Sequence, residues 1–447
     1  MSGALSLKAI DKSILRLAVP AIVSNVTVPL LGLCDTAVSG HLGGSAPLGA
    51  IAVGTMMLNV AYWLFGFLRM GTTGLTAEAF GSGDRDTLQS VLLRGLGLGL
   101  LIGIALICLR GPLGALILHL AGAEPEVAAL ARDYYDICIC GAPALLGTMA
   151  LTGWMIGNQS TGLPMTVAII TNIINIAGSL TFVFGIGLGF TGVAYGTLVA
   201  QWCGLVLSII FSCRLGGTYT PLFSRGASKV WRSLVAGGGL GRYFKVNVNL
   251  FFRSVCIMSV SMTVTAVGAR IGDITLAANA VMMQFFIFFS YFMDGFAFAG
   301  EALCGRYKGA GDWMEMRRSI RRILGWSVCM ALLFFCVYLL AGMPIARMLT
   351  DDEAVRMEIA RYSWAFILIP PLSVGAFVFD GFYIGLTDTG RLLAATVTAA
   401  CIFFVISFLP LHTPLAPNAL LWTAFLSYLS IRALVLGAML PGVVVSR

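Results

Sequence analysis

The stretch VPAIVSNVTVPLLGLCDTAVSG, residues 19 to 40, is apolar enough to lie in a membrane, yet it contains two prolines and an aspartate. A helix needs about 20 mostly apolar residues to cross the hydrocarbon core of a bilayer. A carboxylate in such a helix costs several kcal/mol and is a functional-site candidate by default. The rest of the chain must therefore explain why Asp35 is tolerated.

Similar apolar stretches recur along all 447 residues, of which 58% are hydrophobic and 11% charged, with a mean hydropathy of +0.93. Soluble domains are only about half apolar. We predict twelve membrane-spanning helices, near residues 14–39, 46–76, 88–110, 127–157, 163–185, 190–213, 241–269, 274–304, 319–341, 357–386, 391–411 and 417–440. The first run is too long for a cleavable signal peptide, so we expect it to be the first helix.

The net charge of +8 is distributed unevenly between the predicted loops. If both termini are cytoplasmic, most Lys and Arg residues fall in cytoplasmic loops, which is the arrangement that membrane proteins favour. We therefore predict a multi-pass protein with both termini in the cytoplasm. We expect its basic clusters to contact anionic membrane lipids rather than nucleic acid.

The second half of the sequence repeats features of the first at an offset of 228 residues. The matched features include GSGD at 81–84 with GAGD at 309–312, Tyr134 with Tyr362, Pro143 with Pro371, Gly153 with Gly381 and Gly157 with Gly385. Six helices in each half make a parallel repeat. We predict an all-α fold of two pseudo-symmetric six-helix bundles that form a V-shaped cavity, which is a transporter architecture. The predicted domains are an N-lobe at 1–213, a cytoplasmic linker at 214–240 and a C-lobe at 241–447.

Polar residues in the first half follow helical spacing. Asn172, Asn175 and Ser179 form one stripe on the fifth predicted helix, and Thr197 lies four residues before Gln201 on the sixth. If these stripes face Asp35, they form a cluster in which its carboxyl group can take up and release a proton. The alternative is that the Asn and Thr side chains only hold helices together.

Prolines precede the aspartate on the same helix. Pro20 and Pro29 each remove a backbone donor, so we expect the first helix to bend there. Protonation of the acid could then shift the balance between straight and bent forms.

The second half has its own candidate polar site. It comprises Asp294 and Glu301 on the eighth predicted helix, Asp380 on the tenth, and Arg253 on the seventh as a possible counter-charge. The repeat does not preserve these acids, so the two halves differ in their titratable groups.

Motifs of enzymes are missing from the sequence, which has no HExxH, Walker A, CxxC pair or GxSxG. The GLGFTG at 187–192 follows a membrane helix and fits a tight turn better than a nucleotide site. The eleven cysteines are scattered and predict neither disulfides nor a metal site. We therefore expect no enzymatic activity, no cofactor and no bound metal, with an ion gradient as the energy source.

Three stretches resemble the multidrug and toxic compound extrusion (MATE) transporters, specifically their bacterial DinF-type branch. They are LRLAVPAIVSNVTVPLLGLCDTAVSGHLG, FLRMGTTGLTAEAFGSGD and, in the second half, DGFAFAGEALCGRYKGAGD. The resemblance implies drug export in exchange for protons or sodium. It implies that Asp35 is the coupling residue, that Asn175 and Thr197 are its partners, and that the first helix bends at Pro20. Some relatives have a second aspartate where this chain has Ser179, and a single carboxylate favours protons over sodium.

We therefore expect a monomeric antiporter of the bacterial inner membrane that exports amphipathic, mostly cationic compounds such as lipophilic drugs or dyes. A flippase for lipid-linked precursors is the alternative, and it would require more basic residues inside the spans than Arg253 and Arg69. A membrane-embedded enzyme is the third and weakest interpretation.

Overall fold

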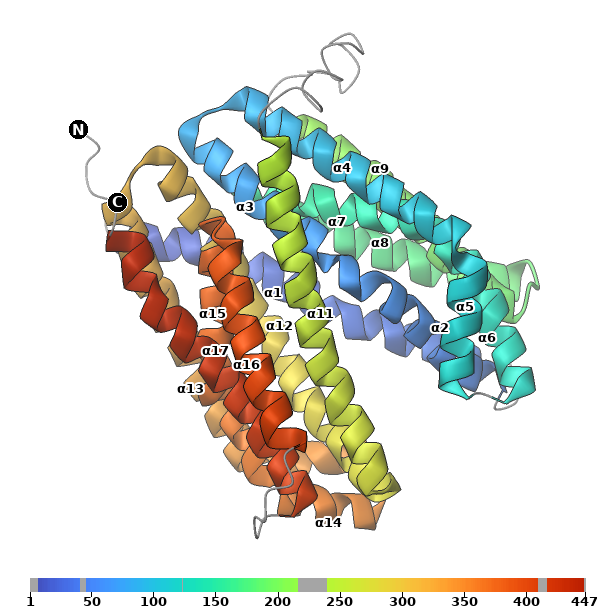
Figure 1. Cartoon of the computed structure of the whole chain (residues 1–447). Helices are drawn as coiled ribbons and strands as arrows, with labels where there is room; N and C mark the ends of the chain where they lie inside the picture. Colours follow the sequence, from blue (N-terminus) through green and yellow to red (C-terminus); the bar gives the residue numbers. More distant parts are fainter. Residues whose placement is uncertain (1–6, 41–45, 123, 216–238, 409–415, 446–447) are drawn as a thin grey trace. The chain divides into compact units, whose positions relative to one another are not determined.

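The structure is a computed structural model that describes residues 7–40, 46–122, 124–215, 239–408 and 416–445 (Figure 1). All regular elements of these residues are helices, as the sequence predicts. Those of the first half are α1 (Leu7–Gly40), α2 (Ala46–Trp63), α3 (Phe67–Ser82), α4 (Arg85–Cys108), α5 (Arg110–Ala121), α6 (Pro125–Cys138), α7 (Ala142–Gly157), α8 (Gly162–Leu180) and α9 (Phe190–Leu215). Those of the second half are α11 (Leu240–Ile271), α12 (Asp273–Ala310), α13 (Trp313–Leu349), α14 (Glu353–Arg361), α15 (Ser363–Gly385), α16 (Thr389–Phe408) and α17 (Pro417–Val445).

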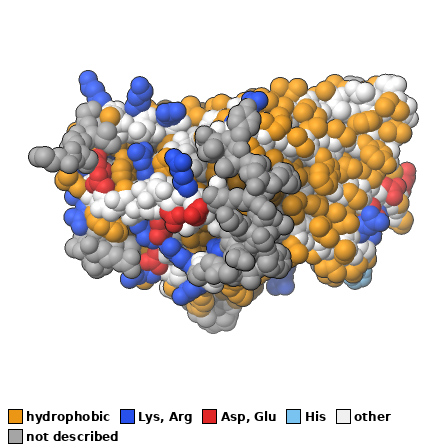
Figure 2. Space-filling view, turned by 90° about the horizontal axis from the view of Figure 1, so that it is seen from above, with side chains coloured by type: hydrophobic (Ala, Val, Ile, Leu, Met, Phe, Trp, Pro, Cys, Tyr) orange, Lys and Arg blue, Asp and Glu red, His pale blue; other side chains and the backbone are white. Residues whose placement is uncertain are grey.

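Eleven helical segments of the described residues are long and apolar enough to cross a membrane. They coincide with eleven of the twelve predicted spans, and α1 contains the remaining one. Many large apolar side chains lie on the surface, including Leu340 at 80% and Leu101 at 67% exposure. Figure 2 shows wide hydrophobic areas, with Lys and Arg gathered in separate groups. An apolar exterior of this extent is what a lipid environment requires, so the prediction of an all-α membrane protein is confirmed.

Two short helices were not predicted. Helix α5 follows α4 almost directly, and α14 precedes α15 inside a region that was predicted as one span. Helix α14 begins where the side chain of Asp352 accepts hydrogen bonds from the backbone N–H groups of Ala354 and Val355. Neither helix is long enough to form an apolar run of its own, which is why a search for spans overlooks both.

Internal packing divides the chain into two compact units. One consists of Val23–Phe244, and the other of Met1–Ile22 with Lys245–Arg447. The first part of α1 therefore belongs with the second half of the sequence, whereas the predicted N-lobe included all of 1–213. Residues 216–238, most of the predicted linker, lie outside the described residues. The V-shaped cavity stays a prediction.

Each unit repeats the backbone features of the other at the offset of 228 residues. Gly83 and Gly311 both have a φ of 71°, and each precedes an aspartate that caps the next helix. The two non-glycine residues of the described chain with positive φ are also equivalent, Gln159 at 63° and Thr387 at 55°. These matches lie in turns, where side-chain chemistry alone would not require them, so they support two structurally equivalent halves.

The helix packing repeats in the same way. Helix α7 packs against α3 in one unit, and α15 packs against α12 in the other. A Cβ atom at Gly153 would overlap with the carbonyl oxygen of Arg69, and one at Gly381 would overlap with that of Ala297. Glycines at these positions let two helix backbones approach closely, as is common in membranes.

Candidate functional site

Asp35 lies on α1 with its carboxyl group largely removed from solvent. Its Oδ1 atom is buried and has no hydrogen-bond partner among the described residues. The described ion pairs do not include Asp35 either. It interacts electrostatically with Tyr134 and Cys138 on α6, both of which are buried. Among the described residues, the surroundings of this carboxyl group therefore contain polar neighbours but no cation in an ion pair with it.

A hydrogen-bonded chain links these neighbours to α8 and α9. Asn175, only 2% exposed, donates from Nδ2 to Thr197 Oγ1 over 3.1 Å. Thr197 Oγ1 donates in turn to the carbonyl of Val193 over 3.1 Å, and the side chain of Tyr134 is hydrogen-bonded to Thr197. Four elements thus meet at one site: α1 with the acid, α6 with the tyrosine, α8 with the amide and α9 with the threonine.

The other polar residues of the predicted stripe differ in position. Ser179 is 1% exposed, and a Cβ atom at Gly196 would come within 2.6 Å of its Oγ, so it lies where α8 and α9 pack most closely. Asn172 is only half-buried, and no described hydrogen bond joins it to Asn175 or Thr197. The structure therefore brings Asn175 and Thr197 together. It leaves Asn172 more exposed than we expected from the polar stripe.

Sequence reasoning missed Tyr134 and Cys138. The repeat pairs Tyr134 with Tyr362, and α6 is amphipathic with Tyr134 and Cys138 on its buried face, but nothing in the sequence connects this face with Asp35. Four residues separate Tyr134 from Cys138, so both lie on the same face of α6. The Sγ atom of Cys138 contacts the carbonyl of Ala194 at 3.7 Å, which places this face against α9.

Pro20 is half-buried in α1, which continues as one α-helix through Pro20 and Pro29. The division between the two packing units falls between Ile22 and Val23, two residues after Pro20. Pro20 therefore lies in the part of α1 that packs with the second half, whereas Asp35 lies in the part that packs with the first.

The second candidate site contains a buried ion-pair cluster. Asp380 accepts hydrogen bonds from Arg253 and from Arg432, and all three residues are 5 to 6% exposed. Arg432 also donates to the hydroxyl of Tyr428 over 3.2 Å, and its guanidinium lies 5.4 Å from the centre of that ring. The predicted pairing of Arg253 with Asp380 is present. Arg432 was missed, because it lies on the last helix and its direction could not be predicted.

The two other acids of this half lie on α12. Glu301 is 1% exposed, and its carbonyl lies against Gly385 of α15. Asp294 is half-buried two turns earlier on the same helix. Among the described residues, no group of three or more His, Cys, Asp or Glu side chains is arranged to hold a metal ion.

Comparisons with known proteins agree with this arrangement. The model of the MatE family matches the chain twice, at residues 20–183 and 250–409, once in each half. The chain is 35% identical to DNA damage-inducible protein F of Escherichia coli over 96% of its length and 91% of that protein. It is 26% identical to the probable multidrug resistance protein NorM of Acinetobacter baylyi, over 95% of this chain and 94% of that one. The crystal structure of the Vibrio cholerae MATE transporter VcmN in the bent form has the same fold, with a TM-score of 0.82 at 20% identity over 98% of both chains.

Proposed function

Because the chain belongs to the MATE family of transporters, in its DinF-type branch, we propose that it is a proton-coupled antiporter that exports drug-like compounds. Members of this family are transporters and not enzymes, and the chain is a multi-pass membrane protein. The proposed location is the bacterial inner membrane, with both termini cytoplasmic. The proposed substrates are amphipathic and mostly cationic, such as lipophilic dyes. The multidrug resistance name of the NorM relative supports a broad substrate range.

The observation that carries the proton coupling is the unpaired carboxyl group of Asp35. An ionised acid in the membrane interior is costly unless a cation or several donors compensate it. The described neighbours of Asp35 are uncharged, and one of its oxygens is buried without a donor. Such a group is easiest to hold in the membrane when protonated, and its proton can be exchanged when water reaches it. A sodium ion would need several oxygen ligands, and the described residues around Asp35 form no group of three or more potential metal ligands.

The proposed conformational step involves α1. Protonation of Asp35 from outside rearranges the helix near Pro20 and releases the drug, and deprotonation toward the cytoplasm resets it. A proline inside a helix removes one backbone hydrogen bond and lowers the cost of a bend. Because Pro20 lies beside the boundary between the two packing units, a bend there would change how α1 connects them. The bent form reported for VcmN supports such a step in this fold.

The flippase alternative is less well supported. It requires cationic groups free to hold a phosphate-linked precursor within the spans. Arg253 is instead paired with Asp380, as is Arg432. No described feature favours this function over drug export.

The test is dye transport by the purified chain in sealed vesicles, driven first by a pH gradient and then by a sodium gradient. We expect transport with the pH gradient, and loss of transport to the background of protein-free vesicles in Asp35→Asn. Asp388→Asn is the matched control, because Asp388 forms an exposed pair with Arg391 and lies far from Asp35 in sequence. Both variants must be present at the wild-type level in the vesicles.

Transport driven by sodium alone would contradict proton coupling. Transport by Asp35→Asn at the wild-type rate would remove Asp35 from the mechanism. Dye movement that responds to neither gradient would contradict antiport altogether.

A further inference from the structure

Helix α13 presents one continuous stripe of exposed residues along most of its length. The stripe follows helical spacing of three and four residues. Its members, in order, are Met314, Arg317, Arg321, Gly325, Val328 and Leu332. Met314 is 57%, Val328 45% and Leu332 54% exposed, and both arginines are exposed as well. The stripe is therefore basic at the start of the helix and apolar beyond Gly325.

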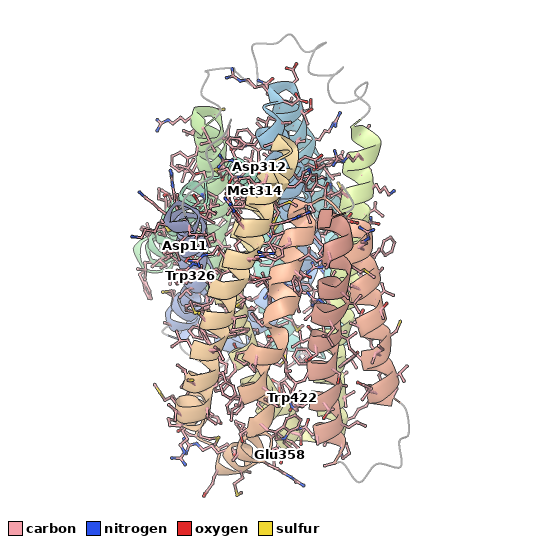
Figure 3. The ribbon with its side chains drawn as sticks, turned by 90° about the vertical axis from the view of Figure 1, so that its left-hand side faces the viewer. Asp11, Asp312, Met314, Trp326, Glu358 and Trp422 are labelled. Carbon is pink, nitrogen blue, oxygen red and sulfur yellow. The ribbon has the colours of Figure 1, made fainter. Side chains whose placement is uncertain are left out.

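The basic end of the stripe borders an open hollow of about 430 Å³, lined by Trp313, Met314, Arg317, Arg318 and Arg321. A glycerophosphate headgroup, with about ten non-hydrogen atoms, therefore fits within it. Figure 3 shows Met314 beside Asp312 at one end of α13, while Trp326 lies farther along the same helix. The hollow is thus at an end of a membrane span, where phospholipid headgroups lie and where tryptophan is common.

Two of the arginines around the hollow, Arg318 and Arg321, differ in their ion pairs. Arg318 donates to Glu315 over 2.6 Å, so its charge is balanced within the helix. Arg321 forms no ion pair among the described residues, and Arg317 extends from the same exposed face one turn earlier. Two guanidinium groups on one face suit a phosphate, because each presents planar paired donors to its oxygens.

The apolar end of the stripe matches an acyl chain. A Cβ atom added at Gly325 would meet no heavy atom within 4 Å, so the helix has a shallow recess directly after Arg321. The twelve residues from Arg321 to Leu332 span about 16 Å at a rise of about 1.5 Å per residue. That is about half of the ~30 Å hydrocarbon core, which is the depth of one leaflet.

We propose that this stripe of α13 binds an anionic phospholipid, with its phosphate on Arg317 and Arg321 and an acyl chain along Gly325, Val328 and Leu332. An ordinary surrounding lipid would be held by the apolar part alone and would show no headgroup preference. The charged end makes this position selective for negative lipids such as phosphatidylglycerol.

The repeat supplies an internal comparison. Helix α4 is equivalent to α13, with Gly97 in the place of Gly325 and Ile104, 56% exposed, in the place of Leu332. Gly97 is equally open. However, the residues equivalent to Arg317 and Arg321 are Gln89 and Leu93. The open glycine and the exposed apolar residue two turns later thus occur in both halves, and the pair of arginines occurs in one.

The test is native mass spectrometry of the full chain in detergent, with phosphatidylglycerol or phosphatidylcholine of the same acyl composition. We expect wild type to retain phosphatidylglycerol preferentially, and the double variant Arg317→Gln/Arg321→Gln to bind it roughly tenfold or more weakly. The matched control, Arg85→Gln/Arg391→Gln, removes the same charge elsewhere and should keep the preference. Equal retention of the two lipids by wild type, or an unchanged preference in the double variant, would overturn the proposal.

Two further measurements distinguish lipid binding from the binding of a simple anion, and a size-exclusion check detects variants that misfold. Gly325→Phe fills the recess while leaving every charge in place, so it should reduce phosphatidylglycerol retention, whereas Gly97→Phe on α4 should not. Inorganic phosphate at millimolar concentration should compete poorly with the lipid. If it displaces phosphatidylglycerol completely, or if the two glycine variants behave alike, the site is not a lipid site. All variants should elute as wild type on size exclusion. If the double arginine variant does not, the single change Arg321→Gln replaces it, and this change should still weaken the retention of phosphatidylglycerol.

Discussion

Two aspartates within the helices of this chain, Asp35 and Asp380, have opposite surroundings, and the contrast separates their roles. Asp380 is neutralised by two arginines, one from α11 and one from α17. Asp35 has uncharged neighbours only, among the described residues. A buried ion pair adds little net stability over an apolar core, but removal of one partner leaves an uncompensated charge. Loss of the Asp380 carboxylate should therefore destabilise the protein. Loss of the Asp35 carboxylate should stop transport and leave the folded structure intact.

The first prediction concerns Asp380. Asp380→Asn leaves the guanidinium groups of Arg253 and Arg432 buried beside each other without a carboxylate. We expect a loss of about 3 to 5 kcal/mol in the free energy of unfolding, seen as a lower Tm of the purified protein in detergent. Asp388→Asn, which breaks an exposed pair with Arg391, should cost about 1 kcal/mol or less. Equal Tm values for the two variants would mean that Arg253 and Arg432 do not need the carboxylate of Asp380 for stability.

The sequence predicted part of each site for identifiable reasons. Asp35, Asn175 and Arg253 are polar residues in apolar helices. Because such residues are costly to place in the membrane, the sequence identifies them as candidate site residues. Tyr134 and Arg432 were missed for different reasons. Tyrosine is common in spans and gives no such signal, while Arg432 lies late in the last helix, where its partner 52 residues earlier cannot be inferred from spacing.

At the scale of helices, the glycines of α7 and α15 set how closely these helices approach their partners. Gly153 and Gly381 are equivalent in the repeat, and each lies against a backbone carbonyl of the neighbouring helix. An added methyl group must push the two helices apart at these points. Gly97 is also helical, but an added Cβ there meets no atom within 4 Å.

We therefore predict opposite effects for the same chemical change. Gly153→Ala and Gly381→Ala should each destabilise the protein by about 1 to 3 kcal/mol through overpacking. Gly97→Ala should be neutral or stabilising by about 0.5 to 1 kcal/mol, because alanine favours the helix. Thermal unfolding of the three variants in one detergent compares them directly. A loss of stability in Gly97→Ala equal to that in Gly153→Ala would refute the packing argument.

At the scale of the whole molecule, the first helix is fastened to the second half of the sequence. Asp11 accepts hydrogen bonds from Arg322, over 2.8 Å from Nε to Oδ1, and from Trp326 over 3.1 Å (Figure 3). Ile10, Ile14 and Ala18 of the same segment are at most 1% exposed. The repeat places Gly239 and Arg94 at the equivalent positions of the other unit, where they also lie in contact.

The third prediction concerns the pH dependence of this fastening. Asp11 precedes the predicted span, and its hydrogen bond with Arg322 holds the pKa of its carboxyl group below the usual value. A lowered folded-state pKa adds stability above the unfolded pKa of about 4 and loses it as the pH falls through the folded value. Asp11→Asn should therefore lower the Tm by a constant amount from about pH 5 to pH 8, and the difference should vanish in stronger acid.

Hydrogen exchange at pH 7 provides the structural check. Amides of residues 7 to 18 should exchange faster in Asp11→Asn than in wild type, and the exposed neighbour Lys12→Gln should leave them unchanged. A Tm difference that rises and falls within pH 5 to 8 would show that another group dominates.

The sequence predicted the helical class, eleven of the spans and the repeat, because apolar run length and residue spacing are local properties. It did not predict that α1 is divided between the packing units, since this depends on contacts such as that of Ala18 with Gly295 of α12. No periodicity within residues 7–22 indicates which distant helix they pack against.

The fastening of α1 has a consequence for biogenesis. Asp11 and Arg322 are separated by 311 residues. At a translation rate of about 5 to 20 residues per second, the ribosome makes the arginine about 15 to 60 s after the aspartate. Residues near Asp11 therefore cannot form these contacts until most of the chain has been synthesised. We expect this N-terminal segment to be one of the last parts of the protein to complete its folding.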